Sequence, residues 1–321
     1  MTGPWPRCSF AAQAAGDPLE GTAPPGDRWL LVEHPGPWPA QALAALPVAV
    51  AAELADWAAR ARARVVLVRR PGRARTGGPR RWFRVDARPG REAVLTGTYA
   101  TESRLPAVVD APGEPYDGPL VLVCTHGRHD TCCAVRGRPV AAALAAEDPE
   151  AVWETTHVGG CRFAPAVVLL PHGYVLAGLD PADAPAVVEG YRRGRLEPRV
   201  VRGRSALPPA VQAAQHHARM ATGAFGVDDL RLVHVTRDRG PDGGTDWHVE
   251  LADPDCSVLL RERFVDTGRP LTCAAAHSGR MRVFDARKIG HEEQERAGAE
   301  ADAGAIAVQG NASNRADPDR P

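Results

Sequence analysis

The sequence is poor in lysine, in aromatic residues and in net charge. Lys288 is the single lysine beside 38 arginines, aromatic residues make up 5% of the chain, and 39 basic residues balance 39 acidic ones. Arginine bias together with abundant alanine, glycine and proline is typical of GC-rich coding sequences. Because neither charge is in excess, nothing in the composition predicts binding to nucleic acid or to a membrane surface.

The sequence also lacks a signal peptide and any apolar run near the roughly 20 residues that span a bilayer. We therefore expect a cytoplasmic protein, in which thiols stay reduced and clustered cysteines indicate a metal site or catalysis rather than disulfides. The seven cysteines are unevenly placed, with four of them between residues 124 and 161. Cys8, Cys256 and Cys273 are scattered and are predicted to be core or surface thiols.

The chain is predicted to contain four regions: an N-terminal α/β region at 1–112, a thioredoxin-like domain at 113–197, a C-terminal α+β region at 198–287 and a disordered tail at 288–321. The N-terminal region should contain strands at 28–34, 65–69, 81–87 and 93–99 and a helix within 39–63. The C-terminal region should contain a helix at 207–223 and strands at 229–237, 246–252, 257–265 and 280–285. The tail is polar and without periodicity.

The middle region has the clearest order of elements. Strands are predicted at 119–124, 152–156, 166–170 and 174–179. Pro139 suits the first position of a helix that ends near Glu147, and Asp180 can cap a last helix over 181–193. This β-α-β-β-β-α order is a trimmed thioredoxin arrangement. The sequence shows no convincing repeat, although the first region also runs strand, helix, strand, strand, strand.

Three cysteines and one histidine follow the ends of two predicted strands in this region. Cys124 ends the first strand, Cys133 lies across a polar loop from it, and His157 and Cys161 come just after the next strand. In a βαβ unit the ends of parallel strands lie at the same edge of the sheet, so these side chains should converge. Four such ligands at one edge could bind a metal cluster or a zinc ion.

The spacing favours a cluster over zinc. Structural zinc sites usually use pairs of ligands two to four residues apart, whereas eight residues separate Cys124 from Cys133. Cys132 is adjacent to Cys133, and since adjacent side chains usually point apart, it is predicted to be a neighbour of the site rather than a ligand.

The motif Cys-Thr-His-Gly-Arg-His-Asp-Thr-Cys-Cys-Ala at 124–134, with Gly-Arg-Pro at 137–139 and His-Val-Gly-Gly-Cys-Arg-Phe-Ala at 157–164, resembles the sucrase/ferredoxin-like family of thioredoxin-like ferredoxins. The resemblance extends over roughly 8–285. It implies a [2Fe–2S] cluster bound by Cys124, Cys133, His157 and Cys161. In fungal and plant relatives the last motif resembles His-Val-Gly-Gly-His, so a second histidine stands where this chain has Cys161. A thiolate there adds negative charge and should lower the reduction potential.

The resemblance implies an electron carrier with an unknown redox partner protein and no substrate turnover of its own. Two alternatives remain open. The same ligands could bind zinc in a thioredoxin-like interaction domain without redox activity. Alternatively, Cys132 or Cys133 could be the reactive thiol of a reductase or peroxidase, although the thioredoxin spacing Cys-x-x-Cys is absent. No pair of carboxylates supports glycoside hydrolysis.

Overall fold

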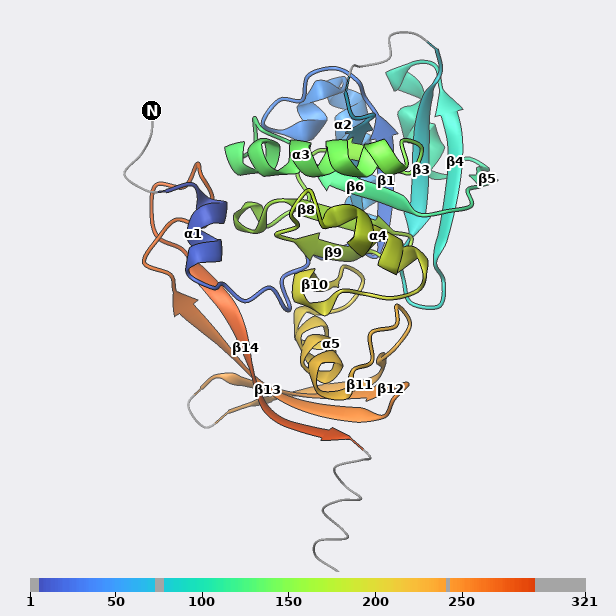
Figure 1. The fold of residues 1–321 in the computed structure, drawn as a ribbon. Helices are drawn as coiled ribbons and strands as arrows, with labels where there is room; N and C mark the ends of the chain where they lie inside the picture. Colours follow the sequence, from blue (N-terminus) through green and yellow to red (C-terminus); the bar gives the residue numbers. More distant parts are fainter. Residues whose placement is uncertain (1–5, 73–77, 241–242, 292–321) are drawn as a thin grey trace, which may run out of the picture.

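The computed structural model describes residues 6–72, 78–240 and 243–291. Its N-terminal part begins with a short helix and continues as strand, helix, strand, strand, strand and a final 3₁₀ helix (Figure 1). These elements are α1 (Cys8–Ala14), β1 (Arg28–Glu33), η1 (Ala42–Ala45), α2 (Val48–Ala61), β2 (Ala63–Arg69), β3 (Arg80–Asp86), β4 (Ala93–Tyr99) and η2 (Glu102–Val109). The helix predicted within 39–63 is shorter than expected, because Leu46 precedes a proline and is extended, with ψ of 159°.

The middle part has the predicted order β-α-β-β-β-α. Its elements are β6 (Leu120–Cys124), α3 (Thr131–Glu147), β7 (Val152–Thr155), η3 (Cys161–Phe163), β8 (Ala166–Leu170), β9 (Tyr174–Ala177) and α4 (Ala184–Arg192), preceded by the two-residue strand β5 (Glu114–Pro115). The prediction that the first helix begins at Pro139 is wrong. The helix begins eight residues earlier, because the side chain of Asp130 accepts a hydrogen bond from the backbone N–H of Cys132 and caps it. Pro139 lies inside the helix.

The two parts have the same topology and share one sheet. In the first, β1 pairs in parallel with β2 and antiparallel with β3, which pairs with β4. In the second, β6 has the same relation to β7, β8 and β9. The copies join where β2 and β7 pair antiparallel, at Val68 with Thr155 and Arg69 with Glu154. The N-terminal part is therefore a structural repeat of the middle part.

The repeat places equivalent side chains on the same faces of the sheet. Trp29 and Leu31 of β1 share one buried cluster with Leu122 and Cys124 of β6, whereas the intervening residues of both strands pack on the helical side. Alternation along a strand sends successive side chains to opposite faces. Cys124 consequently points to the face that lacks α2 and α3, which the N-terminal segment covers with Cys8 and Ala23.

The C-terminal part adds a tenth strand to the large sheet and forms a second, antiparallel sheet of four strands in sequence order. Its elements are η4 (Pro198–Val200), β10 (Val201–Arg204), α5 (Pro209–Thr222), β11 (Arg231–Arg239), β12 (Thr245–Ala252), β13 (Cys256–Asp266) and β14 (Arg280–His291). The full order of the large sheet is β10-β9-β8-β6-β7-β2-β1-β3-β4-β5. Helix α5 packs between the sheets, and its alanine-rich face contacts Val249 and Val258 (Figure 1).

The predicted C-terminal helix and strands are present with shifted ends. Residues 288–291 continue β14 instead of beginning the predicted tail, because Lys288 and His291 pair with Leu259 and Cys256 of β13. Residues 292–321 lie outside the described residues. None of the helices in the described ranges is both long and apolar enough to cross a membrane.

Candidate metal centre

The structure brings together the four residues that the sequence singles out. Cys124 ends β6, Cys133 lies in the first turn of α3, His157 follows β7 and Cys161 begins η3. The ligand atoms of Cys124, Cys133 and His157 all lie within 4.8 Å of one another, and the Cys161 sulfur is 3.4 Å from Nδ1 of His157. All three thiols are buried, with 3% exposure or less.

A close approach between α3 and β6 sets the distance between Cys124 and Cys133. At Gly137 a Cβ atom would lie 2.1 Å from the carbonyl oxygen of Cys124. Only glycine lets the helix backbone pass so near the end of the strand. The resulting proximity places the first turn of α3, with Cys133, beside the last residue of β6.

Two consecutive glycines and a buried arginine shape the loop that carries the other two residues. Gly159 and Gly160 have φ of 104° and 75°, which lets the chain turn between His157 and Cys161. Arg202, 1% exposed, donates a hydrogen bond of 3.0 Å to the carbonyl of Gly159 and others to Thr22. Burial lowers the pKa of Arg202 to about 9, while the nearby sulfurs of Cys161 and Cys124 favour its charged form.

His126 fixes the start of that loop. Its Nδ1 accepts a hydrogen bond of 3.2 Å from the backbone N–H of His157, so its Nε2 is the protonated nitrogen and donates to the carbonyl of Pro39 at 2.7 Å. His129 is exposed and its ring stacks on that of His157 at 3.7 Å between centroids. The ring of His129 therefore lies between His157 and solvent.

The thiols and the imidazole shift one another's pKa values. A hydrogen bond from Cys133 lowers the pKa of Cys124 despite burial, and a second from His157 lowers it further, whereas the same contact raises the pKa of Cys133. Contact with Cys133 also lowers the pKa of Cys161, to about 7. Burial lowers the pKa of His157, but hydrogen bonds with Cys124 and Cys161 outweigh it and raise the pKa to about 9. Cys124 and Cys161 are thus favoured as thiolates, the form that binds metals, whereas the thiol of Cys133 holds its proton.

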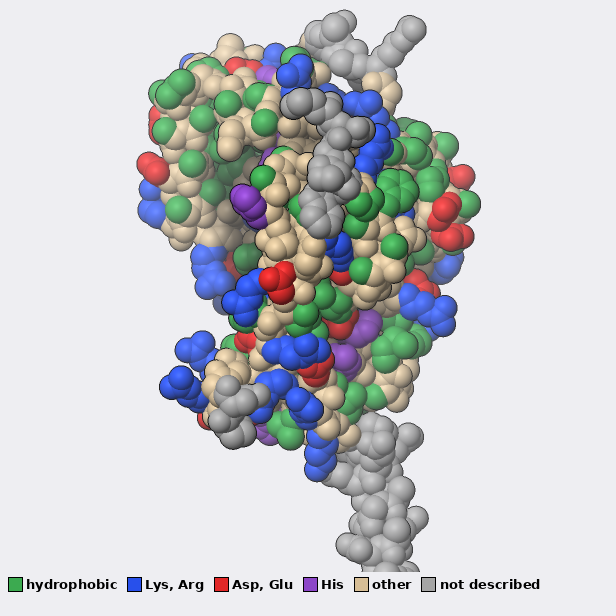
Figure 2. All heavy atoms as spheres, turned by 90° about the vertical axis from the view of Figure 1, so that its left-hand side faces the viewer, with side chains coloured by type: hydrophobic (Ala, Val, Ile, Leu, Met, Phe, Trp, Pro, Cys, Tyr) green, Lys and Arg blue, Asp and Glu red, His purple; other side chains and the backbone are tan. Residues whose placement is uncertain are grey.

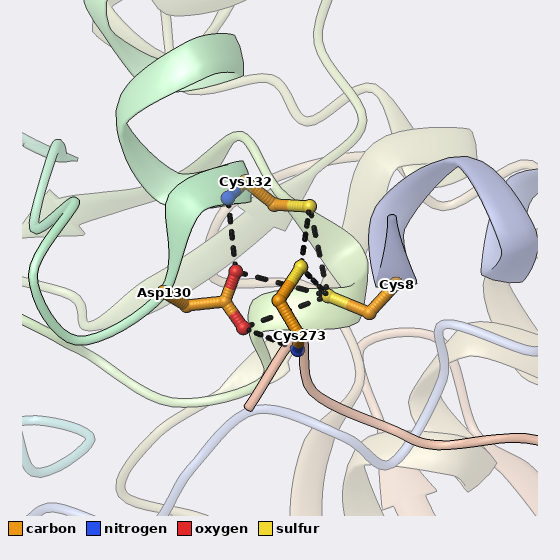
Figure 3. A group of neighbouring side chains, drawn as sticks. All are labelled: Cys8, Asp130, Cys132 and Cys273. Carbon is orange, nitrogen blue, oxygen red and sulfur yellow. Dashed lines mark hydrogen bonds between the residues drawn. The ribbon is translucent and has the colours of Figure 1, made fainter. Parts of the chain in front are cut away.

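Cys132 points away from this site and into a second group of thiols, which the sequence did not indicate. Its sulfur is 3.6 Å from that of Cys8 and 3.3 Å from that of Cys273, beside Asp130 (Figure 3). Cys8 is a buried core thiol and Cys273 an exposed one, as predicted, but the two also contact each other. Cys256, in contrast, is a buried residue of the C-terminal core, as expected.

The family profile of the sucrase/ferredoxin-like proteins matches residues 19–203. This match extends over more than half of the chain and includes both strands, the helix and the loop that carry the candidate site. The chain therefore belongs to the sucrase/ferredoxin-like family, and the expected α/β fold class is confirmed.

Solved structures of one small protein are similar to part of the chain. The thioredoxin-like [2Fe–2S] ferredoxin from Aquifex aeolicus is 23% identical, with a TM-score of 0.26, over 29% of this chain and 97% of the ferredoxin. A cysteine-to-serine variant of that ferredoxin is 24% identical, with a TM-score of 0.24, over 26% of this chain and 97% of the variant. The search of curated proteins found no match.

Proposed function

We propose that this protein binds a [2Fe–2S] cluster through Cys124, Cys133, His157 and Cys161 and serves as an electron carrier. The observation that carries the proposal is the convergence of three buried thiols and one imidazole from the ends of two parallel strands and the start of one helix. Membership of the sucrase/ferredoxin-like family supports it. The proposed role includes a redox partner protein as donor or acceptor.

The donor set fits such a cluster. Iron–sulfur clusters are bound by thiolates, with imidazole replacing thiolate in some [2Fe–2S] sites. Cys133 contacts the sulfurs of both Cys124 and Cys161, so the three thiols form one continuous group rather than two separate pairs. When bound, the cluster accepts and releases one electron at a time.

The surrounding residues orient the ligands and limit access of water. His126 and Arg202 fix the backbone on either side of the loop that carries His157 and Cys161. Arg202 also places a buried positive charge near the thiolates, which offsets part of the negative charge that three of them bring. The ring of His129 covers that of His157, so the site is screened from solvent on this side.

The test is a pair of spectra of the full chain purified without air, taken before and after addition of dithionite. We expect visible charge-transfer bands that bleach on reduction, together with a rhombic paramagnetic resonance signal. Cys124→Ser should lose both features. Cys256→Ser is the matched control, because this cysteine is also buried but lies in the C-terminal core.

Two results would overturn the proposal. A colourless wild-type protein with zinc bound by the same four residues would indicate a zinc-stabilised interaction domain. Turnover of thiol substrates by the metal-free protein, abolished by Cys133→Ser, would indicate a thiol enzyme.

A further inference from the structure

Three cysteine sulfurs form a close triangle outside the proposed cluster site, here called the ferredoxin site, which consists of Cys124, Cys133, His157 and Cys161. The Sγ atoms of Cys8, Cys132 and Cys273 are separated by 3.6 Å, 3.3 Å and 3.5 Å (Figure 3). A carboxylate lies against them, with the two oxygens of Asp130 at 3.9 Å and 3.6 Å from the sulfur of Cys8. All four residues have their ligand atoms within 4.8 Å of one another.

These residues come from three distant segments of the chain. Cys8 begins α1, Asp130 and Cys132 lie at the start of α3, and Cys273 lies between β13 and β14. Figure 1 shows α1 beside the β13–β14 connection at one side of the molecule. The carboxylate of Asp130 accepts hydrogen bonds of 2.9 Å from the backbone N–H groups of Cys132 and Cys273, which fixes two of the three segments relative to each other.

The spacing fits ligands of a single metal ion. Sulfurs bound to one tetrahedral zinc at about 2.3 Å lie roughly 3.8 Å apart, and a carboxylate oxygen at about 2.0 Å lies roughly 3.5 Å from them. The observed separations of 3.3 to 3.6 Å between sulfurs and 3.6 Å from sulfur to oxygen are close to both values. In a cluster of four irons, each thiolate binds a different iron, so the sulfurs would be farther apart.

A disulfide accounts for less of this arrangement. It would join two of the sulfurs and leave the third beside it without a role. Three thiols and a carboxylate around one point instead match the four ligands that zinc binds in tetrahedral sites.

We propose that Cys8, Cys132, Cys273 and Asp130 bind one thiophilic divalent cation, zinc in the first instance, as a structural site. The ion joins the N-terminal helix and the β13–β14 connection to the helix that carries Cys133. This site is separate from the ferredoxin site and does not depend on it, although Cys132 and Cys133 are neighbours in sequence.

A set of ion pairs beside the thiols joins the same segments. Asp17, whose side chain is 2% exposed, pairs with Arg162 of η3 and with Arg269 of the β13–β14 connection. Asp17 follows α1, so these two ion pairs join the segment that supplies Cys8 to η3 and to the β13–β14 connection. Figure 2 shows this side of the molecule, where basic side chains gather over the C-terminal sheet.

The first test is the metal content of the full chain, expressed with zinc and iron and purified without air. We expect Cys273→Ser to contain about one zinc fewer per chain than the wild type, with unchanged iron. Cys273 is exposed and lies in a connection, so its replacement should preserve the fold. Cys124→Ser should lose iron and retain this zinc, and Cys256→Ser should retain both metals.

A second test uses the unmodified protein and does not depend on a variant that folds. An exposed free thiol reacts quickly with iodoacetamide, whereas a metal-bound thiolate is protected. We expect Cys273 to be alkylated at least ten times faster after addition of a zinc chelator, as measured by peptide mass spectrometry.

The same measurements can overturn the proposal. Equal zinc content in the wild type and Cys273→Ser, equal alkylation with and without chelator, or a disulfide among the three cysteines would each contradict it. If the proposed electron-carrier function fails, the iron is absent from every variant, yet the loss of one zinc on replacing Cys273 is still expected. The two failures are therefore distinguishable.

Discussion

Replacing Gly137 by alanine should destabilise the protein although alanine is the better helix former. Alanine in place of glycine within a helix gains about 1 kcal/mol from propensity. At this position, however, the new Cβ would lie 2.1 Å from the carbonyl oxygen of Cys124, more than 1 Å inside ordinary contact. Overpacking against backbone costs about 3 kcal/mol. The net loss of about 2 kcal/mol should lower the melting temperature by roughly 4–8 °C.

The assay is thermal unfolding of the full chain followed by circular dichroism, with iron content measured in parallel. Iron should fall as well, because the helix must move away from the strand that carries Cys124. Gly190→Ala in α4 is the matched control: its Cβ would lie at an ordinary 3.6 Å from the nearest atom, so this variant should be as stable as the wild type or slightly more stable. A Gly137→Ala protein that matches or exceeds the stability of Gly190→Ala would refute the reasoning.

Three further predictions follow from the buried charges and the ligand set. Burial favours a raised pKa for Glu92, but hydrogen bonds, including one from Arg204, lower it overall. A carboxyl group whose pKa is lowered on folding stabilises the folded state at pH values above its unfolded pKa, and this stabilisation is lost in acid. Glu92→Gln should therefore lower the free energy of unfolding by about 1 kcal/mol at neutral pH and by little near pH 3, as measured in urea titrations. An equal loss at both pH values would contradict this. Arg202→Met should lower the free energy of unfolding by about 3 kcal/mol, because two backbone carbonyls and one hydroxyl lose their hydrogen-bond donor. It should also reduce iron binding, and the two effects are measured by denaturation and metal analysis. Unchanged values would show that the loop at 157–161 does not need Arg202. Cys161→His should raise the reduction potential by roughly 100 mV in a redox titration, since neutral imidazole replaces thiolate, and an unchanged potential would exclude Cys161 as a ligand.

The convergence of the candidate ligands could be predicted because it follows from local order along the chain. A strand, a helix and a parallel strand bring their ends to one edge, so the positions of Cys124 and His157 depend only on recognising a βαβ unit. The start of α3 was missed because Pro139 was interpreted as a first helical residue. The signal that identifies the true start is Asp130 two residues before Cys132, which is typical of an N-cap.

The second thiol group could not be predicted from spacing. Cys8 and Cys273 are 265 residues apart, and their contact depends on how α1 and the β13–β14 connection pack against α3. In the sequence the duplication appears only as a similar order of predicted elements, because the two copies share a pattern of burial but not the identity of their residues. The pairing of Val68 with Thr155, which joins the copies, likewise depends on tertiary packing.

The way the two copies meet also determines how the chain avoids association through its strands. Alone, either copy would expose the edge of β2 or β7, and an unpaired edge is a template for another chain. In the joined sheet β2 and β7 pair with each other, so neither edge is free. The outermost strands are the two-residue β5, which contains Pro115, and the four-residue β10, which is interrupted by a bulge at Val201 and Gly203. The longer outer strand β14 of the second sheet carries Arg280 and Arg282. Short, bulged, proline-containing or charged edges resist aggregation, so the duplication protects the ferredoxin-like part from pairing with its own copies.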